Sequence, residues 1–170
     1  MISSLIEQLG YDKRVYFCRK SNMATYTTEI ASDTLVSDNP IHQRLLRAYS
    51  LAAPYVNGEL LELGCGEGRG VEILEPLSNS YVGLYKIGEV IDTLKAKYPD
   101  LDFRQAVFPP FKDIQSNSID SVVSFQVIEH VKDDAGFLAE IHRVLRPGGV
   151  AVLTTPNIKK TLSRNPWHIR

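Results

Sequence analysis

The chain has 170 residues, of which 44% are hydrophobic and 23% are charged, and this is enough to bury the core of one globular domain. Its 19 Lys and Arg residues nearly balance its 20 Asp and Glu residues, and the formal net charge of -1 contains no long run of either sign. This balance argues against nucleic acid as a partner.

Neither a membrane span nor a secretion signal is predicted. The segment from Met1 to Arg14 mixes apolar and polar residues, and no apolar run in the chain is long enough to cross a bilayer. The two cysteines, Cys18 and Cys65, lack the spacing of a structural zinc site, and we interpret both as free thiols in a reducing compartment. We therefore expect a soluble, cytoplasmic protein without a metal site.

The first 40 residues show little periodicity in their apolar residues. Residues 1–40 are polar and irregular, with a turn signal at Asp38-Asn39-Pro40, and we expect a lead-in segment or lid there. Apolar residues then recur at helical spacing from Ile41 to Tyr55, which predicts a helix that ends at Asn57-Gly58.

From residue 59 onward, short apolar runs alternate with helical segments. The predicted strands are 59–63, 80–85, 101–105, 119–125 and 149–155, and the predicted helices are 68–77, 87–98 and 133–145. Strand, helix, strand units with right-handed crossovers predict an α/β fold, a Rossmann-like three-layer sandwich with a mainly parallel sheet. Ligands bind such folds at the carboxyl ends of the strands. The linker from Ala106 to Ser118 contains proline and is too short for a full crossover helix.

The strongest local feature runs from Leu60 to Gly70, where an apolar strand enters a loop with glycine at every second position. Such a loop lets a ligand touch the backbone, although the same glycines can also form only a tight strand-to-helix turn. A dinucleotide-binding fingerprint requires glycine where this chain has Arg69, which disfavours a nicotinamide-dependent oxidoreductase.

Three segments, in order, resemble class I S-adenosylmethionine-dependent methyltransferases. The glycine loop is similar to the first motif of that family, residues 118–131 to its fourth-strand motif, and residues 142–157 to the turn and fifth strand that follow. The combination of Glu129-His130-Val131 with Asn39-Pro40 and Arg44 resembles small-molecule O-methyltransferases, including the ubiquinone-biosynthesis type and some sugar-modifying relatives. The resemblance implies a methyltransferase domain over residues 41–170.

The resemblance also implies a site for S-adenosylmethionine, with S-adenosylhomocysteine as the product. In such relatives an arginine at position 44 reaches the carboxylate of the cofactor, with Arg47 as the fallback, and Glu62 helps to bind its ammonium group. A solvated helix face is the alternative for the arginines, and a helix-dipole partner is the alternative for Glu62. The implied cofactor-binding residues are Arg44, Glu62, Gly64, Cys65, Gly66, Tyr85, Val107, Phe108, Phe125 and Gln126.

Two positions depart from the family pattern. The family has Asp or Glu at the end of the second strand to accept both ribose hydroxyls, and this chain has Tyr85. A neutral phenol in place of a carboxylate should weaken binding by about 1.5–3 kcal/mol. An acid is also missing after the third strand, where Val107 and Phe108 could still enclose the adenine.

The catalytic candidates are His130 and Glu129, which follow the fourth predicted strand. If the methyl acceptor is a hydroxyl, His130 is the best-placed general base and Glu129 could orient it. A purely local structural role for His130 remains the alternative. The expected acceptor is a small molecule.

The family normally continues beyond the fifth strand, and we expect the last two strands to be missing here. That would leave residues 150–154 as an exposed apolar edge that could pair with a second copy. The missing strands and Tyr85 together motivate a second hypothesis, a cofactor-impaired or non-catalytic domain with the methyltransferase fold.

Overall fold

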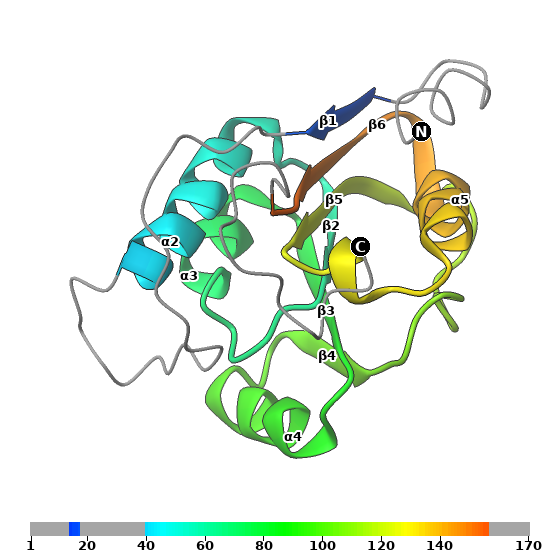
Figure 1. Ribbon diagram of the computed structural model, residues 1–170. Coiled ribbons are helices and arrows are strands. Elements are labelled where there is room, and N and C mark those ends of the chain that lie inside the picture. Colours follow the sequence, from blue (N-terminus) through cyan, green and yellow to red (C-terminus); the bar gives the residue numbers. More distant parts are fainter. Residues whose placement is uncertain (1–13, 18–39, 157–170) are drawn as a thin grey trace.

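The computed structural model describes residues 14–17 and 40–156, with side chains from Leu45 onward, and its strands form one parallel sheet (Figure 1). The strands are β1 (Arg14–Phe17), β2 (Glu59–Leu63), β3 (Ser80–Tyr85), β4 (Asp102–Gln105), β5 (Ile119–Phe125) and β6 (Leu145–Thr154). Their order in the sheet is β1-β6-β5-β2-β3-β4, and every neighbouring pair is parallel.

The strand order reverses at the centre of the sheet. From β2 the chain builds outward through β3 to β4, then returns to the other side of β2 and builds outward through β5 to β6. In an open parallel sheet, the crevice for a ligand forms beyond the carboxyl ends of the strands at such a switch point. The end of β2 and the end of β5 therefore mark the expected place of a site.

Helices cover both faces of the sheet, which confirms the predicted α/β sandwich (Figure 1). The helical elements are α2 (Pro40–Ala52), η1 (Ala53–Tyr55), α3 (Val71–Leu74), η2 (Glu75–Leu77), α4 (Gly88–Lys97), η3 (Ile128–His130) and α5 (Asp134–Val144). Buried residues of α2, α3 and α4 pack with Val123 and Val152 on one face, whereas α5 packs with Val122 and Leu153 on the other. No helix among the described residues is long and apolar enough to cross a membrane.

The N-terminal part of the chain contributes a strand that the sequence analysis did not predict. Arg14–Phe17 pairs in parallel with Val150–Leu153 and forms the edge of the sheet beside β6. The expectation of an irregular segment was therefore wrong for these residues, in which Val15, Tyr16 and Phe17 all favour strands. The expected lid over residues 18–39 lies outside the described part of the chain.

The same pairing corrects the expectation that β6 is an exposed edge. Strand β6 lies between β1 and β5 and exchanges backbone hydrogen bonds on both sides. An edge strand recruits a partner because its backbone groups are unpaired, and the described β6 lacks that property. The reason for expecting self-association through β6 is removed.

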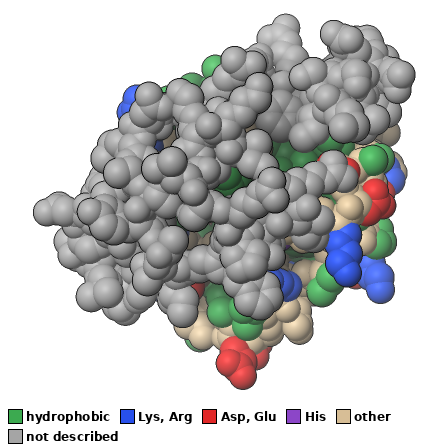
Figure 2. All heavy atoms as spheres, viewed as in Figure 1, with side chains coloured by type: hydrophobic (Ala, Val, Ile, Leu, Met, Phe, Trp, Pro, Cys, Tyr) green, Lys and Arg blue, Asp and Glu red, His purple; other side chains and the backbone are tan. Residues whose placement is uncertain are grey.

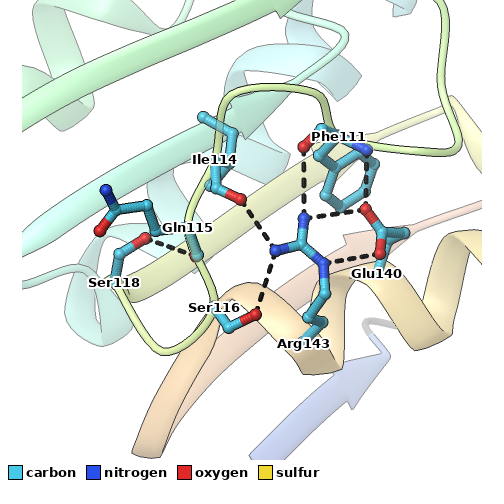
Figure 3. Close-up of polar contacts among 7 residues, drawn as sticks. All are labelled: Phe111, Ile114, Gln115, Ser116, Ser118, Glu140 and Arg143. Atoms are coloured by element: carbon cyan, nitrogen blue, oxygen red, sulfur yellow. Dashed lines mark hydrogen bonds and ion pairs between the residues drawn. The ribbon is translucent and has the colours of Figure 1, made fainter.

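The connection from β4 to β5 contains no helix, as predicted, and α5 holds it in place (Figure 3). The Arg143 guanidinium donates to the backbone carbonyls of Phe111 and Ile114, at 3.2 and 2.8 Å, and to the hydroxyl of Ser116 at 3.3 Å. Glu140 accepts from the Phe111 N–H at 2.8 Å and from Arg143 at 2.7 and 2.9 Å. One ion pair on α5 thus satisfies three backbone groups of this linker, the N–H and carbonyl of Phe111 and the carbonyl of Ile114.

This clamp gives a prediction for acid stability. The hydrogen bonds from Arg143 lower the pKa of Glu140 against an opposing effect of burial, and the Phe111 N–H lowers it further. An acid with a lowered folded-state pKa contributes stability above its ordinary pKa of 4.5, and this contribution is lost as the pH falls through the folded-state value. The Glu140→Gln variant should therefore be less stable than the parent at pH 7 by about 1 kcal/mol, after allowance for solvent screening, and the difference should shrink below pH 4.5.

Urea unfolding of both proteins across this pH range measures the difference. Asp102→Asn is the matched control, because Asp102 pairs with Arg104 on the surface and the two side chains are 44% and 37% exposed. The control should lose less at pH 7. Equal losses in the two variants, or a Glu140→Gln effect that does not vary with pH, would contradict the proposed role of the clamp.

Candidate functional site

The loop after β2 is fixed to the neighbouring strand by its backbone. The N–H groups of Gly64 and Cys65 both donate to the carbonyl of Leu84 in β3, at 2.8 and 3.2 Å. The loop then turns through a hydrogen bond from the Gly68 N–H to the Cys65 carbonyl at 3.0 Å and enters α3. These bonds hold the glycine loop at the switch point of the sheet.

The glycines of this loop serve two different purposes. A Cβ on Gly64, Gly68 or Gly70 would lie only 2.4, 2.5 or 2.0 Å from atoms of Val127, Leu94 or Tyr49, respectively. These three glycines are therefore required because protein side chains occupy the space beside them. At Gly66, which has a φ of +55°, a Cβ would meet no atom of the described structure within 4 Å. Among the four glycines of this loop, only Gly66 has no described atom beside it on the side where a Cβ would stand.

Glu62 lies one residue before the end of β2 and is almost completely buried, with 1% of its surface exposed. Its Oε1 accepts a hydrogen bond from the hydroxyl of Tyr49 at 2.7 Å, and its Oε2 accepts one from the hydroxyl of Tyr81. Burial raises the pKa of Glu62, and the two hydroxyl groups oppose that shift. The sequence analysis missed both tyrosines, because their spacing on a helix and a strand shows only that they face the core.

Cys65 is buried beneath the loop and contributes its backbone rather than a reactive thiol. Burial, and to a smaller extent the nearby Glu62, raise the pKa of its thiol. A Cβ on Gly83 would lie 3.2 Å from the Cys65 sulfur, so the side chain fills a gap against β3. A protonated thiol in this position is a poor nucleophile.

Tyr85 ends β3 and stands beside Gln105, its partner in the sheet register. Its ring is partly buried and packs against the core on the side of α2, α3 and α4. Burial raises the pKa of Tyr85, with smaller contributions from Cys65 and Glu67, so its phenol is neutral at physiological pH. The class I methyltransferases that the sequence resembles have a carboxylate at the position of Tyr85, and this chain has no charge there.

Val107 and Phe108, the second and third residues after β4, differ in their environment. Val107 is 80% exposed. The ring of Phe108 packs against Phe111 and Phe137, with centroid distances of 5.8 and 5.7 Å. Of this pair, Val107 is the side chain that lies open to a ligand, whereas Phe108 packs against the core on the α5 face.

At the end of β5 the backbone turns sharply. Gln126 has a φ of +60°, which is unusual for a residue with a side chain, and two bonds to Thr154 stabilise it there. Its N–H donates to the Thr154 carbonyl at 2.9 Å and its Nε2 to the Thr154 hydroxyl at 3.1 Å. Phe125, which precedes it, is buried and meets the Tyr49 ring edge-on at 4.7 Å.

The two catalytic candidates lie next to each other in η3 but in different environments. Glu129 is buried and accepts a hydrogen bond from the Thr155 hydroxyl at 3.3 Å, whereas His130 is exposed. Among the remaining candidates, Arg44 lies in α2 with its side chain outside the described atoms, and Arg47 is exposed. The described residues contain no group of three His, Cys, Asp or Glu side chains that could hold a metal ion.

Charged side chains of both signs lie on the described surface of the protein. On the described part of the face in Figure 2, acidic, basic and apolar side chains are interspersed. Arg104, Arg143 and Arg146 are all engaged with acidic side chains.

Comparisons with known proteins identify the family. Residues 61–153 match the model of the methyltransferase domain, which covers the sheet from β2 to β6 together with the glycine loop. The chain therefore belongs to the methyltransferase-domain family.

Three relatives illustrate the range of similarity. A probable S-adenosylmethionine-dependent methyltransferase of Mycolicibacterium smegmatis is 39% identical over 118 residues, which cover 66% of this chain and 45% of the relative. The human mitochondrial ubiquinone biosynthesis O-methyltransferase is 29% identical over 154 residues, which cover 86% of this chain and 40% of the relative. The chain thus spans less than half of the length of either curated relative. The crystal structure of an S-adenosylmethionine-dependent methyltransferase of Mesorhizobium loti superposes with a TM-score of 0.58 at 26% identity, over 64% of this chain and 51% of that one.

The open side of Gly66 gives a prediction with a matched control. Gly66 and Gly148 both have a positive φ, +55° and +81°, and a Cβ on either would meet no atom of the described residues within 4 Å. Alanine at each position should cost a similar backbone strain of about 1–2 kcal/mol. Only Gly66→Ala should also weaken the binding of S-adenosylhomocysteine, by at least about tenfold, because its methyl group would enter the ligand space.

Isothermal titration calorimetry measures the affinity, and thermal unfolding confirms that both variants lose similar stability. If Gly66→Ala and Gly148→Ala bind S-adenosylhomocysteine equally well, the loop does not hold the ligand.

Proposed function

We propose that this chain is the cofactor-binding domain of an S-adenosylmethionine-dependent methyltransferase that acts on a small molecule. The observation that carries the proposal is the open backbone at Gly66, at the switch point of the sheet and next to the buried acid Glu62. The residues present fit the amino-acid end of the cofactor, because that end needs close backbone approach and an anion for its ammonium group. The names of the relatives support the same assignment.

The roles of the residues follow the course of the crevice. Gly64, Cys65 and Gly66 would supply backbone contacts, and Glu62 would act on the ammonium group through water, since each of its oxygens already accepts one tyrosine hydroxyl. Arg44 would bind the carboxylate of the cofactor.

The wall of the crevice beyond the loop would hold the rest of the cofactor. Tyr85 would lie at the ribose and Val107, with the backbone at Phe108, at the adenine. Phe125 and Gln126 would line the side nearest the acceptor. The exposure of Val107 and the backbone turn at Gln126 support this order along the crevice.

When bound, S-adenosylmethionine supplies a methyl group on a sulfonium, which is an activated electrophile. The chain must then align the acceptor and exclude water. We propose a hydroxyl acceptor, because His130 in η3, which follows β5, could accept the hydroxyl proton on an imidazole nitrogen. Glu129, held by Thr155, would position the backbone turn that carries His130. The likeness to the human mitochondrial ubiquinone biosynthesis O-methyltransferase supports this acceptor class.

One observation favours a second candidate, a methyltransferase fold with impaired cofactor binding. Tyr85 replaces a charged acceptor by a neutral, partly buried ring. A carboxylate accepts both ribose hydroxyls with charge assistance, whereas a phenol offers one hydroxyl on a larger ring. The two candidates differ in how strongly the unmodified chain binds the cofactor.

Calorimetric titration of the full chain with S-adenosylhomocysteine, beside the variants Tyr85→Asp and Tyr85→Phe, separates them. If the missing charged hydrogen bond is the main defect, Tyr85→Asp should bind about 10- to 150-fold more tightly than the parent, which corresponds to about 1.5–3 kcal/mol. If the Tyr85 hydroxyl itself serves the ribose, Tyr85→Phe should bind more weakly than the parent.

Micromolar binding by the parent chain would support a working methyltransferase, and binding by Tyr85→Asp alone would support the impaired domain. Absence of binding by all three proteins would overturn the cofactor assignment.

A further inference from the structure

Tyr49 of α2 is the side chain through which that helix meets the glycine loop. Its ring covers the face of Gly70 where a side chain would otherwise stand, since a Cβ there would lie 2.0 Å from Tyr49 Cε1. The same ring meets Phe125 edge-on at an interplanar angle of 84°. Its hydroxyl donates to Glu62 at 2.7 Å. One buried residue from outside the matched residues 61–153 thus contacts the start of α3 and the ends of β2 and β5.

Tyr81 provides an internal comparison. It donates to the other oxygen of the same carboxylate, but it belongs to β3, which is already paired with β2 from Ser80 to Leu84. Its ring packs against Phe103 of β4, with centroids 5.6 Å apart. Loss of the Tyr81 hydroxyl therefore removes a bond to Glu62 within the sheet, whereas loss of the Tyr49 hydroxyl removes a bond between a helix and the sheet.

We propose that Tyr49 is a positioning residue that couples the docking of α2 to the occupation of the cofactor pocket. The argument rests on the proposed function. A cation bound near Glu62 favours its charged form, and a charged carboxylate accepts a stronger hydrogen bond from Tyr49 than a neutral one. Occupation of the pocket thus tightens the attachment of α2.

Thermodynamic reciprocity then requires that a well-docked α2 also increases the affinity for the ligand. The helix also carries Arg44, five residues before Tyr49. The docking of α2 therefore sets the position of the Arg44 backbone.

Hydrogen exchange of the full chain, with and without saturating S-adenosylhomocysteine, tests this coupling in Tyr49→Phe and Tyr81→Phe. Each variant keeps its ring and loses one hydroxyl donor to Glu62. In the ligand-free chain, Tyr49→Phe should speed exchange of the α2 amides by about tenfold or more, whereas Tyr81→Phe should leave them unchanged. Ligand should slow α2 exchange in the parent and in Tyr81→Phe, and much less in Tyr49→Phe.

Gly70→Ala gives a second route to the same result, because its methyl group would displace the Tyr49 ring, together with the hydroxyl that the ring carries, without removing the hydroxyl. It should also speed α2 exchange. Equal α2 exchange in Tyr49→Phe and Tyr81→Phe would overturn the inference even if the parent binds the ligand well. A different outcome is faster α2 exchange in Tyr49→Phe alone, with no ligand binding by the parent. It would support the role of Tyr49 in attaching α2, but it would refute both the coupling of α2 to the pocket and the proposed function.

Discussion

The backbone conformation of the loop after β2 is the constraint on which the rest of the site depends. Gly64 and Gly68 both have a φ of +80°, and Val127, Leu94 and Tyr49 pack into the space left by the missing side chains of this loop. Three separate elements thereby approach the end of the central strand, namely η3 with its preceding residue, α4 and α2. A residue with a side chain at any of these positions would push one of them away. Among the loop glycines of the described structure, only Gly66 has no side chain packed beside it, and this is the side on which we propose that the ligand binds.

The two faces of the sheet are stabilised in different ways. On one face, α2, α3 and α4 pack regularly, and the buried Glu62 with its two tyrosines lies between them and β2. On the other face, α5 is the only α-helix among the described residues that packs on the sheet, and Phe108, Phe111 and Ile114 of the linker complete that core. The bonds from Glu140 and Arg143 to the linker backbone make this possible. An ion pair on α5 therefore fixes the linker backbone at Phe111 and Ile114.

Much of the fold could be predicted from the sequence because short apolar runs alternate regularly with segments of helical periodicity. The predicted bounds of β2, β3 and β5 agree with the structure, and β4 begins one residue later. Strand β6 begins earlier than predicted, at Leu145, because Leu145 pairs with Ile119 across an irregularity in the ladder. The pairing of Arg14–Phe17 with β6 was missed because a four-residue strand far from its partner has no local signal beyond its β-favouring residues.

The site was predictable in part. The glycine loop was recognised from its composition, and Tyr85 from its place at the end of a predicted strand. The hydrogen bonds of Tyr49 and Tyr81 to Glu62 were not predictable, since they join residues 13 and 19 positions apart through tertiary packing. The sequence also could not distinguish Gly66 from the other loop glycines. Only the packing of Val127, Leu94 and Tyr49 shows which of these glycines have a protein side chain beside them.

The central claim is that a ligand with the chemistry of S-adenosylhomocysteine enters the crevice at the carboxyl ends of β2, β3 and β5, on the open side of Gly66. Amide chemical shifts of the ¹⁵N-labelled full chain during a titration with S-adenosylhomocysteine test it most directly. The account predicts saturable shifts at residues 64–67 and at the residues that follow β3 and β5, with little change at Asn57 and Gly58 at the opposite end of the sheet. Shifts centred on the opposite end, or no saturable shift at Gly66, would contradict it.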